Sequence, residues 1–179
     1  RLTPGAHAML IGSQPLNDHD AATRLILDHI PHIPNWPQLP VYSKEGMVEQ
    51  FMTGLPGLTC SDNRVYVDTA AETFDTQLLA FFETYLATLD QDGPMAADSP
   101  WGLTPSGAKG FFCLLDALDA PPDSLVAVKG QVTGPITFCT GLHDHQKRAI
   151  FYNDALRDAA VKMLALKAAW QADMLAVAG

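Results

Sequence analysis

The fold is most constrained by the way in which short apolar runs alternate with longer helical patterns. Runs typical of buried strands occupy residues 8–13, 65–67 and 125–132, and the proline-rich residues 36–40 must be extended. Apolar residues recur at helical spacing over residues 18–30, 44–53, 70–89, 104–118 and 146–177. Strands that alternate with helices are typical of a parallel sheet with helical crossover connections. We therefore predict an α/β fold.

The length of the chain limits this fold to part of a larger architecture. A closed (β/α)8 barrel needs ~250 residues, whereas this chain has 179 residues and about four predicted strands. We expect a small open α/β sheet or the N-terminal portion of a TIM barrel with parallel strands, in a single domain over residues 1–179. Since a half barrel leaves a strand edge unpaired, we expect a homo-oligomer or a longer polypeptide that supplies the missing C-terminal half.

Local signals mark where several helices begin. Asp18 and Asp20 favour the N-terminus of the helix at 18–30. Thr104 resembles an N-cap, followed by Pro105 at the first helical position. The turn at residues 133–135, Thr-Gly-Pro, begins another helix.

Charge and hydropathy exclude two classes of partner. The 11 basic and 20 acidic residues give a net charge of −9, without a basic run. A negative field repels nucleic acid and anionic membrane surfaces, so we expect neither as a partner. No apolar stretch approaches the roughly 18 residues of a membrane helix. The three cysteines, at positions 60, 113 and 139, are widely spaced, which favours reduced, buried thiols in a cytoplasmic protein.

The strongest candidate for a binding site is the segment KGQVTGPIT at residues 129–137. A strand carries Lys129 and Gln131 towards its end, and Gly134 and Pro135 then begin a helix. A strand end that meets a helix N-terminus is a natural site for an anion such as a carboxylate. The alternative is a tight corner in which Lys129 pairs with a neighbouring aspartate.

This segment resembles the signature of the catalytic domain of cobalamin-independent methionine synthase, whose superfamily includes uroporphyrinogen decarboxylase and corrinoid-dependent methyltransferases. Three further segments are similar in order and spacing: IGSQP at 11–15, MVEQF at 47–51 and ALRD at 155–158. The resemblance implies methyl transfer to a homocysteine-like thiol. It also implies that the amino-acid end of this substrate contacts Ile11, Gly12 and Ser13. We expect Lys129, Gln131, Thr133 and Gly134, in the segment that carries the signature, to face the substrate as well. The resemblance assigns no catalytic residue.

The chain departs from the family pattern at three places. Residues 41–45, VYSKE, replace the His-Gly-Glu whose glutamate holds the substrate amine. Residues 138–141, FCTG, lack the tryptophan that stacks on the folate. The Arg-Gln-Ala-Gly-Arg-Tyr signature of uroporphyrinogen decarboxylase is missing. A corrinoid-dependent methyltransferase, a uroporphyrinogen decarboxylase-like protein and a non-catalytic fragment or binding module therefore stay open as alternatives.

The resemblance implies a zinc ion that activates the thiol, with its ligands in the C-terminal half and therefore outside this chain. Within the chain, His143 and His145 form the only close histidine pair, which on a loop is a weak metal signal. Cys139 lies near the predicted site and is interpreted as a small buried hydrophobic residue.

Overall fold

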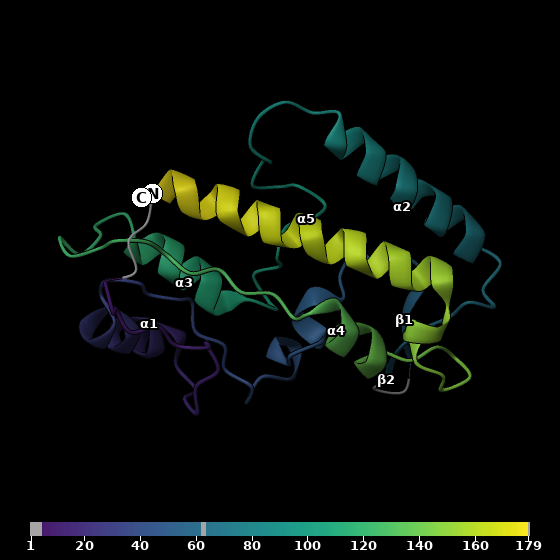
Figure 1. The fold of residues 1–179 in the computed structure, drawn as a ribbon. Coiled ribbons are helices and arrows are strands. Elements are labelled where there is room, and N and C mark those ends of the chain that lie inside the picture. The colour runs from purple at the N-terminus through teal and green to yellow at the C-terminus, as the bar shows by residue number, and fades with distance from the viewer. Residues whose placement is uncertain (1–4, 62–63, 179) are drawn as a thin grey trace. The chain divides into compact units, whose positions relative to one another are not determined.

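The computed structural model describes residues 5–61 and 64–178 (Figure 1). The α helices are α1 (His19–His29), α2 (Phe74–Leu89), α3 (Lys109–Ala117), α4 (Pro135–Gly141) and α5 (Asp154–Ala178). The strands are β1 (Leu58–Ser61) and β2 (Arg64–Val67). Single-turn 3-10 helices lie at Ser43–Glu45, Glu49–Phe51 and Ile150–Tyr152.

The chain contacts group these elements into two units. The first comprises the described residues of Arg1–Gln50, Leu103–Gln131 and Gln171–Gly179. The second comprises those of Phe51–Gly102 and Val132–Trp170. The first unit therefore contains α1 and α3, and the second contains the hairpin, α2 and α4. The long helix α5 contributes residues to both.

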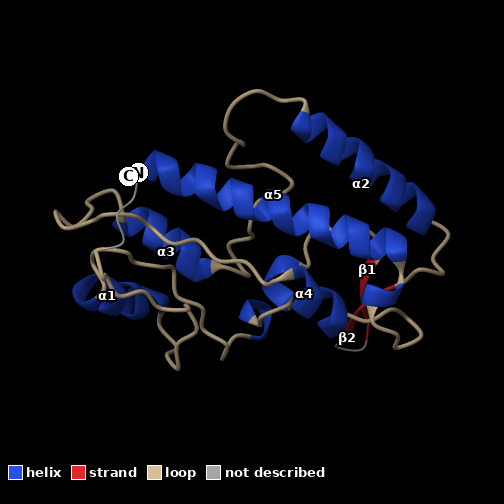
Figure 2. Ribbon diagram, in the orientation of Figure 1, coloured by secondary structure: helices blue, strands red, loops and turns tan. Residues whose placement is uncertain are grey.

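The predicted α/β fold, a partial (β/α)8 barrel with about four parallel strands, is wrong. In the described residues the sheet has two antiparallel strands, β1 and β2, with Leu58 opposite Val67 and Ser61 opposite Arg64. Figure 2 shows that strands are confined to this hairpin and that helices and loops make up the rest. The strand predicted at 65–67 is confirmed, but its partner β1 was not predicted.

The segments predicted as parallel strands make only isolated bridges in the first unit. Ser13 pairs with Gln38, and Asn35 pairs with Lys129, both in parallel. A ladder needs a backbone N–H at every second residue, and proline has none. The prolines at 34, 37 and 40 therefore stop the central segment from pairing along its length.

The first segment also differs from the prediction in its burial. Residues 8–13 were expected to be a buried strand, but Ile11 is 86% exposed, and Met9 and Leu10 are exposed as well. In the segment at 125–132, Val126 and Val132 are exposed too. Without a ladder, and without a covering layer on these side chains, the two segments remain extended loops.

Helix α1 confirms the prediction made from its acidic N-terminus. The Asp18 carboxylate accepts a hydrogen bond from the Ala21 N–H at 2.9 Å and so caps the first turn. That hydrogen bond lowers the pKa of Asp18. Helix α4 begins at Pro135, as the Thr-Gly-Pro turn predicted.

Four other predicted helices begin later than predicted or are broken. Thr104 is not an N-cap, because its carbonyl accepts from Gly107 N–H and Ala108 N–H in a turn, and α3 begins only at Lys109. Helix α2 begins at Phe74 and α5 at Asp154. Two 3-10 turns, Ser43–Glu45 and Glu49–Phe51, replace the helix predicted at 44–53.

The core of the first unit centres on Trp36, which is fully buried. Its ring meets the Phe111 ring edge to face at 6.0 Å, and its Nε1–H donates to Gln171 Oε1 at 3.1 Å. Gly110 allows α3 to approach the Pro37 backbone, because a Cβ at position 110 would lie 2.0 Å from the Pro37 carbonyl oxygen. These contacts join α3, the end of α5 and the proline-rich segment.

In the second unit α2 supplies aromatic side chains to the core. Phe74 and Phe81 are buried, and Phe81 meets the Trp101 ring edge to face at 5.3 Å. The Trp101 indole N–H donates to Thr88 Oγ1 at 2.8 Å. Lys162 of α5 lies over the rings of Phe82 and Tyr85.

None of the described helices, α5 included, has both the length and the apolar character that crossing a membrane requires.

A lysine is fully buried in the second unit. Lys167 of α5 has no exposed surface, and its Nζ donates to the Gly102 carbonyl oxygen at 3.4 Å. Burial lowers the pKa of Lys167 from 10.5 to about 8 because the charged form loses its hydration.

This burial predicts that stability rises with pH in the alkaline range. Below about pH 8 the lysine is charged in both the folded and unfolded states, and the folded state carries the full cost of the buried charge. Between about pH 8 and 10.5 only the unfolded state keeps the proton, so the cost is relieved by about 3 kcal/mol.

The test is urea unfolding of wild type and Lys167→Met across this pH range. We expect the wild type to gain stability relative to Lys167→Met as the pH rises. Lys147→Met, at an exposed lysine of the same unit, is expected to follow the wild type. Parallel pH profiles for wild type and Lys167→Met would contradict the prediction.

Candidate functional site

Two predicted substrate segments that lie far apart in the sequence meet in the first unit. The Lys129 ammonium donates to the Ile11 carbonyl oxygen at 3.4 Å. Gly12 packs against the Gln131 amide, because a Cβ on Gly12 would fall 2.2 Å from Gln131 Oε1. Gly12 also has a φ of +129°, which side chains with a Cβ rarely adopt. The structure thus places Ile11 and Gly12 beside Lys129 and Gln131.

Gln131 is held by hydrogen bonds on both its backbone and its side chain. Its N–H donates to Gln171 Oε1 at 3.1 Å, and its carbonyl accepts from Gln171 Nε2 at 2.9 Å. Its side-chain Nε2 donates to the Trp36 carbonyl oxygen at 3.0 Å. The remaining side-chain oxygen, Oε1, is buried and has no donor within the described part of the chain. This atom is an acceptor positioned beside Gly12.

Lys129 supplies a positive charge in this region. Its side chain is partly buried, and burial lowers the pKa of the Lys129 ammonium below 10.5. The aspartate partner considered as an alternative is absent among the described ion pairs. Among the described residues, the Lys129 ammonium makes one long hydrogen bond, to the Ile11 carbonyl oxygen. The ammonium therefore retains N–H donors for a ligand.

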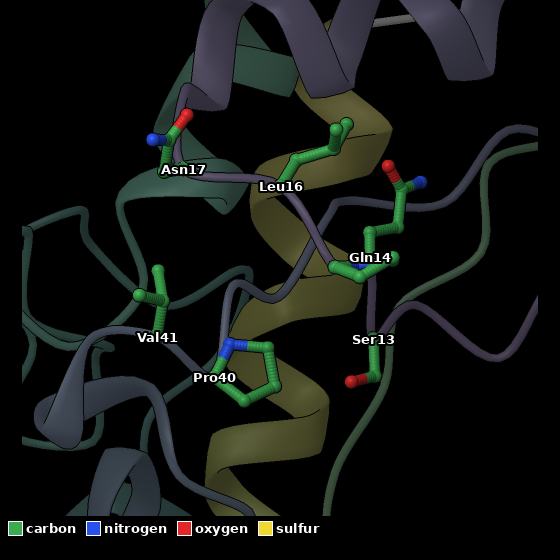
Figure 3. A pocket seen from close by; sticks show the side chains of 7 residues that line it. Ser13, Gln14, Leu16, Asn17, Pro40 and Val41 are labelled. Atoms are coloured by element: carbon green, nitrogen blue, oxygen red, sulfur yellow. The ribbon is translucent and has the colours of Figure 1, made fainter.

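Ser13 lies at the edge of a pocket of about 660 Å3, which we call the Ser13 pocket. The pocket is lined by residues 13–17 together with Pro40 and Val41. Figure 3 shows the Ser13 hydroxyl on the side that faces Pro40, with the Asn17 amide farther along the same wall. The pocket therefore combines three polar side chains, those of Ser13, Gln14 and Asn17, with apolar walls.

The backbone at Ser13 is also available for binding. Gln38 uses its N–H and its carbonyl on Gly12 O and Gln14 N, both at 2.9 Å. Neighbouring peptide groups point to opposite sides of an extended segment, so the Ser13 N–H points away from Gln38. Within residues 5–61 and 64–178 it has no acceptor. A carboxylate at this position would receive hydrogen bonds from the hydroxyl and the N–H.

The other two predicted substrate residues, Thr133 and Gly134, belong to the second unit. Thr133 is buried, and Gly134 is the N-cap of α4 with its carbonyl accepting from the Phe138 N–H at 3.0 Å. No heavy atom lies within 4 Å of where a Gly134 Cβ would be. Their role in substrate binding stays a prediction.

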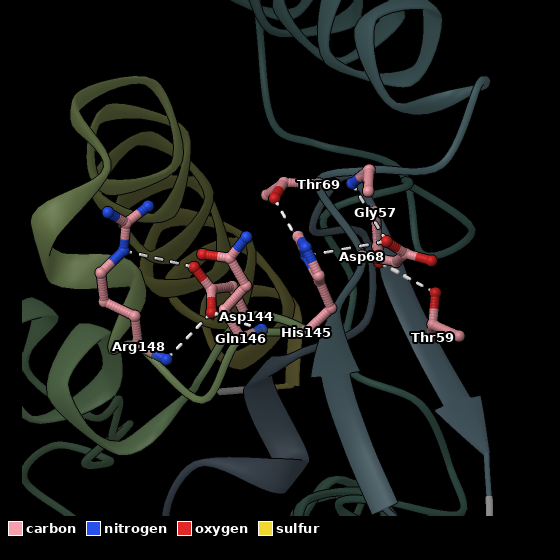
Figure 4. A network of polar contacts seen from close by, with 9 residues as sticks. Gly57, Thr59, Asp68, Thr69, Asp144, His145, Gln146 and Arg148 are labelled. Carbon is pink, nitrogen blue, oxygen red and sulfur yellow. Dashed lines mark hydrogen bonds and ion pairs between the residues drawn. The ribbon is translucent and has the colours of Figure 1, made fainter.

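His145 belongs to a polar network around a turn in the second unit (Figure 4), and His143 lies two residues before it in the chain. The buried Asp144 carboxylate accepts from the N–H groups of Gln146 and Arg148, each at 2.9 Å. Burial opposes ionisation of Asp144, but these hydrogen bonds outweigh it and lower the pKa of the carboxyl. His145 Nδ1 lies 3.2 Å from Thr69 Oγ1 and 3.8 Å from the Asp68 carboxylate. The network holds the turn against β2, through the Val67 N–H bond to the His143 carbonyl.

The cysteines differ in their surroundings. All three are free, and Cys139 is buried as expected. Cys60 is exposed, so the prediction of buried thiols is wrong for this residue. Burial raises the pKa of Cys113 to about 11, which keeps that thiol protonated and unreactive near neutral pH.

Sequence reasoning missed a second cavity in the first unit, of about 570 Å3, which we call the His19 cavity. Its wall includes a buried pair: His19 Nε2 lies 2.6 Å from Glu45 Oε1. The other Glu45 oxygen accepts from the Leu39 N–H at 2.9 Å. The two partners are 26 positions apart, and no short motif links them. The acidic side chain in VYSKE was the only available signal.

The described residues do not assemble a metal site. No group of three or more His, Cys, Asp or Glu side chains in this part of the chain is arranged to hold a metal ion.

Comparison with known proteins found no match to the chain among protein-family models, curated proteins or solved structures. The function is therefore inferred from the motifs and from the geometry of the first unit.

Proposed function

We propose that this chain binds the amino-acid end of a homocysteine-like thiol, as the substrate-binding part of a thiol methyltransferase. The observation that carries the proposal is the meeting of the IGS segment with the KGQ segment. Two motifs separated by more than a hundred residues, and both linked to substrate binding by the resemblance, contact one another through Lys129 and Ile11.

The groups at this place suit a zwitterionic amino acid. The Ser13 hydroxyl and N–H, together with the Lys129 ammonium, are donors for a carboxylate. Gln131 Oε1, which is buried without a donor, is an acceptor for an ammonium. The family glutamate that would otherwise hold the amine is replaced here, so Gln131 supplies the acceptor in this proposal.

The proposal for these residues is limited to binding and orientation. In the resemblance, zinc lowers the pKa of the thiol and presents a thiolate to the methyl donor. The described residues do not fit such an ion, and we derive no step through it. The ion would be held by residues other than these.

The test is calorimetric titration of the protein with L-homocysteine under reducing conditions. We expect saturable binding that Lys129→Gln and Ser13→Ala each weaken at least about tenfold, because each removes a hydrogen bond to a charged group. We also expect no binding of 3-aminopropane-1-thiol, which has the thiol and the amine but no carboxylate.

Two matched variants serve as controls. Arg24→Gln removes one exposed positive charge from α1, and Ser124→Ala removes an exposed hydroxyl from a turn. Both are expected to bind homocysteine like the wild type. Absence of binding, or equal weakening by the site variants and the controls, would contradict the proposal.

A further inference from the structure

The His19 cavity has a positively charged wall in a strongly acidic protein. Lys44 and Lys109 both line it, with Ser43 and Ser106 beside them. Neither lysine forms an ion pair within the described residues. The chain as a whole has a net charge of −9. The positive charge of two lysines at one cavity is therefore opposite in sign to the net charge of the protein.

The single acidic group of this wall already has hydrogen-bond partners on both of its oxygens. Glu45 is 3% exposed, and its two oxygens accept from His19 and from the Leu39 N–H. Outside the wall, the Asp18 carboxylate feels the charge of Lys109 but is bonded to the Ala21 N–H. The charge that faces the cavity is therefore positive.

His19 presents one ring nitrogen that has no partner among the described residues. The side chain is 5% exposed and lines the cavity. Its Nε2 is used by Glu45, and its ring is stacked on Tyr42 at 5.2 Å, which fixes its orientation. Nδ1 has no hydrogen bond to any described residue. The imidazole is therefore held in place by Glu45 and Tyr42, and its second nitrogen is available to a ligand in the cavity.

The N-terminus of α3 lies at this cavity without a side-chain cap, whereas the N-terminus of α1 is already capped by the Asp18 carboxylate. His19 is the first residue of α1 and Lys109 the first residue of α3, and both line the cavity. The N-cap of α3 is Ala108, which has no side-chain hydrogen bond to the first turn. The first N–H groups of a helix and its dipole favour an anion.

From this arrangement we propose that the His19 cavity binds the oxyanion group of a small molecule, a phosphate or a carboxylate, between Lys44, Lys109 and His19. This site lies beyond the homocysteine site and does not depend on it. The lysines supply charge, Ser43 and Ser106 supply hydroxyl donors, and the imidazole, in the form that carries a proton on both ring nitrogens, donates to the oxyanion through Nδ1–H.

The experiment is NMR titration of the 15N-labelled protein with inorganic phosphate and, separately, with succinate, in a buffer free of other oxyanions. We expect saturable binding of at least one of them, with shifts of the His19 imidazole nitrogens. His29, an exposed histidine at the other end of α1, is expected not to shift. Binding of phosphate alone identifies a phosphate group, and binding of succinate identifies a carboxylate.

The variant Lys44→Gln/Lys109→Gln is expected to weaken this binding at least about tenfold. Lys44 is exposed and Lys109 lies on the cavity wall, so thermal unfolding should be unchanged. Arg24→Gln, which removes a charge elsewhere on α1, is expected to bind like the wild type. The proposal is overturned by absence of saturable binding, by an unshifted His19, or by equal effects of the lysine and Arg24 variants. Because homocysteine is not used, the two proposals fail separately.

Discussion

Replacing Trp36 by alanine is expected to destabilise the protein by about 4 kcal/mol. The side chain is fully buried and packs edge to face on Phe111, so its removal leaves a cavity that rigid neighbours cannot fill. The indole N–H bond to Gln171 is lost as well. Because whole domains are stable by only about 5–15 kcal/mol, this one change should remove a large part of the total.

Urea unfolding followed by circular dichroism measures this loss, and two variants calibrate it. Trp36→Phe keeps most of the buried ring area but removes the hydrogen-bond donor, and we expect a loss of about 1–2 kcal/mol. Gln171 Oε1 still accepts from the Gln131 N–H in that variant. Tyr152→Ala, at an aromatic side chain that is 71% exposed, should cost less than about 1 kcal/mol. Equal losses for Trp36→Ala and Tyr152→Ala would show that Trp36 is not in the core.

Replacing Glu45 by alanine is expected to destabilise the protein by about 3 kcal/mol. The carboxylate receives hydrogen bonds from two buried groups, the His19 ring and the Leu39 N–H. Removing the carboxylate leaves the His19 ring nitrogen and the Leu39 N–H buried without a hydrogen-bond partner. The desolvation penalty of these two groups costs more than the net free energy of the lost hydrogen bonds.

The matched control is Glu49→Ala, because Glu49 is an exposed glutamate only four positions away. We expect it to change the unfolding free energy by less than about 0.5 kcal/mol. Glu45→Gln keeps an acceptor oxygen and is expected to fall between the two. A Glu45→Ala variant as stable as Glu49→Ala would show that the His19–Glu45 pair does not hold α1 and the 3-10 turn at Ser43–Glu45 together.

Much of the helical structure is predictable because its signals are local. The Asp18 cap, the apolar spacing that follows it and the Gly134-Pro135 turn each depend on residues within a few positions of one another. The β-branched and aromatic residues at 65–67 likewise predict β2. The start of α3 was placed too early because the turn after Thr104 forms before the helix does.

The strands could not be predicted in the same way. An apolar run at 8–13 or 125–132 is compatible with a strand, but a strand exists only where a neighbour supplies a full ladder of hydrogen bonds. The intervening segment contains proline at 34, 37 and 40 and can pair only at single residues. The apolar pattern of one segment does not reveal that the neighbouring segment lacks the N–H groups needed for a full ladder.

The candidate site, too, is only partly predictable from the sequence. The motifs indicated Ser13, Lys129 and Gln131 as substrate-facing, and the chemistry of each residue is legible from its type. The closeness of Ile11 to Lys129, the unsatisfied oxygen of Gln131 and the pairing of His19 with Glu45 depend on folding. None of these pairs or contacts has a signature in a short window of the chain.

By itself the sequence determined the net negative charge, the Asp18 cap of α1, the start of α4, and the residue types available for binding a zwitterion or an anion. Only the tertiary structure decided how the extended segments pair, which apolar side chains stay exposed, and that two lysines and a buried imidazole share one cavity. The physical reason is range. Caps and helical faces follow from interactions over three or four residues, whereas pairing, burial and cavities follow from contacts between segments that the chain brings together only when it folds.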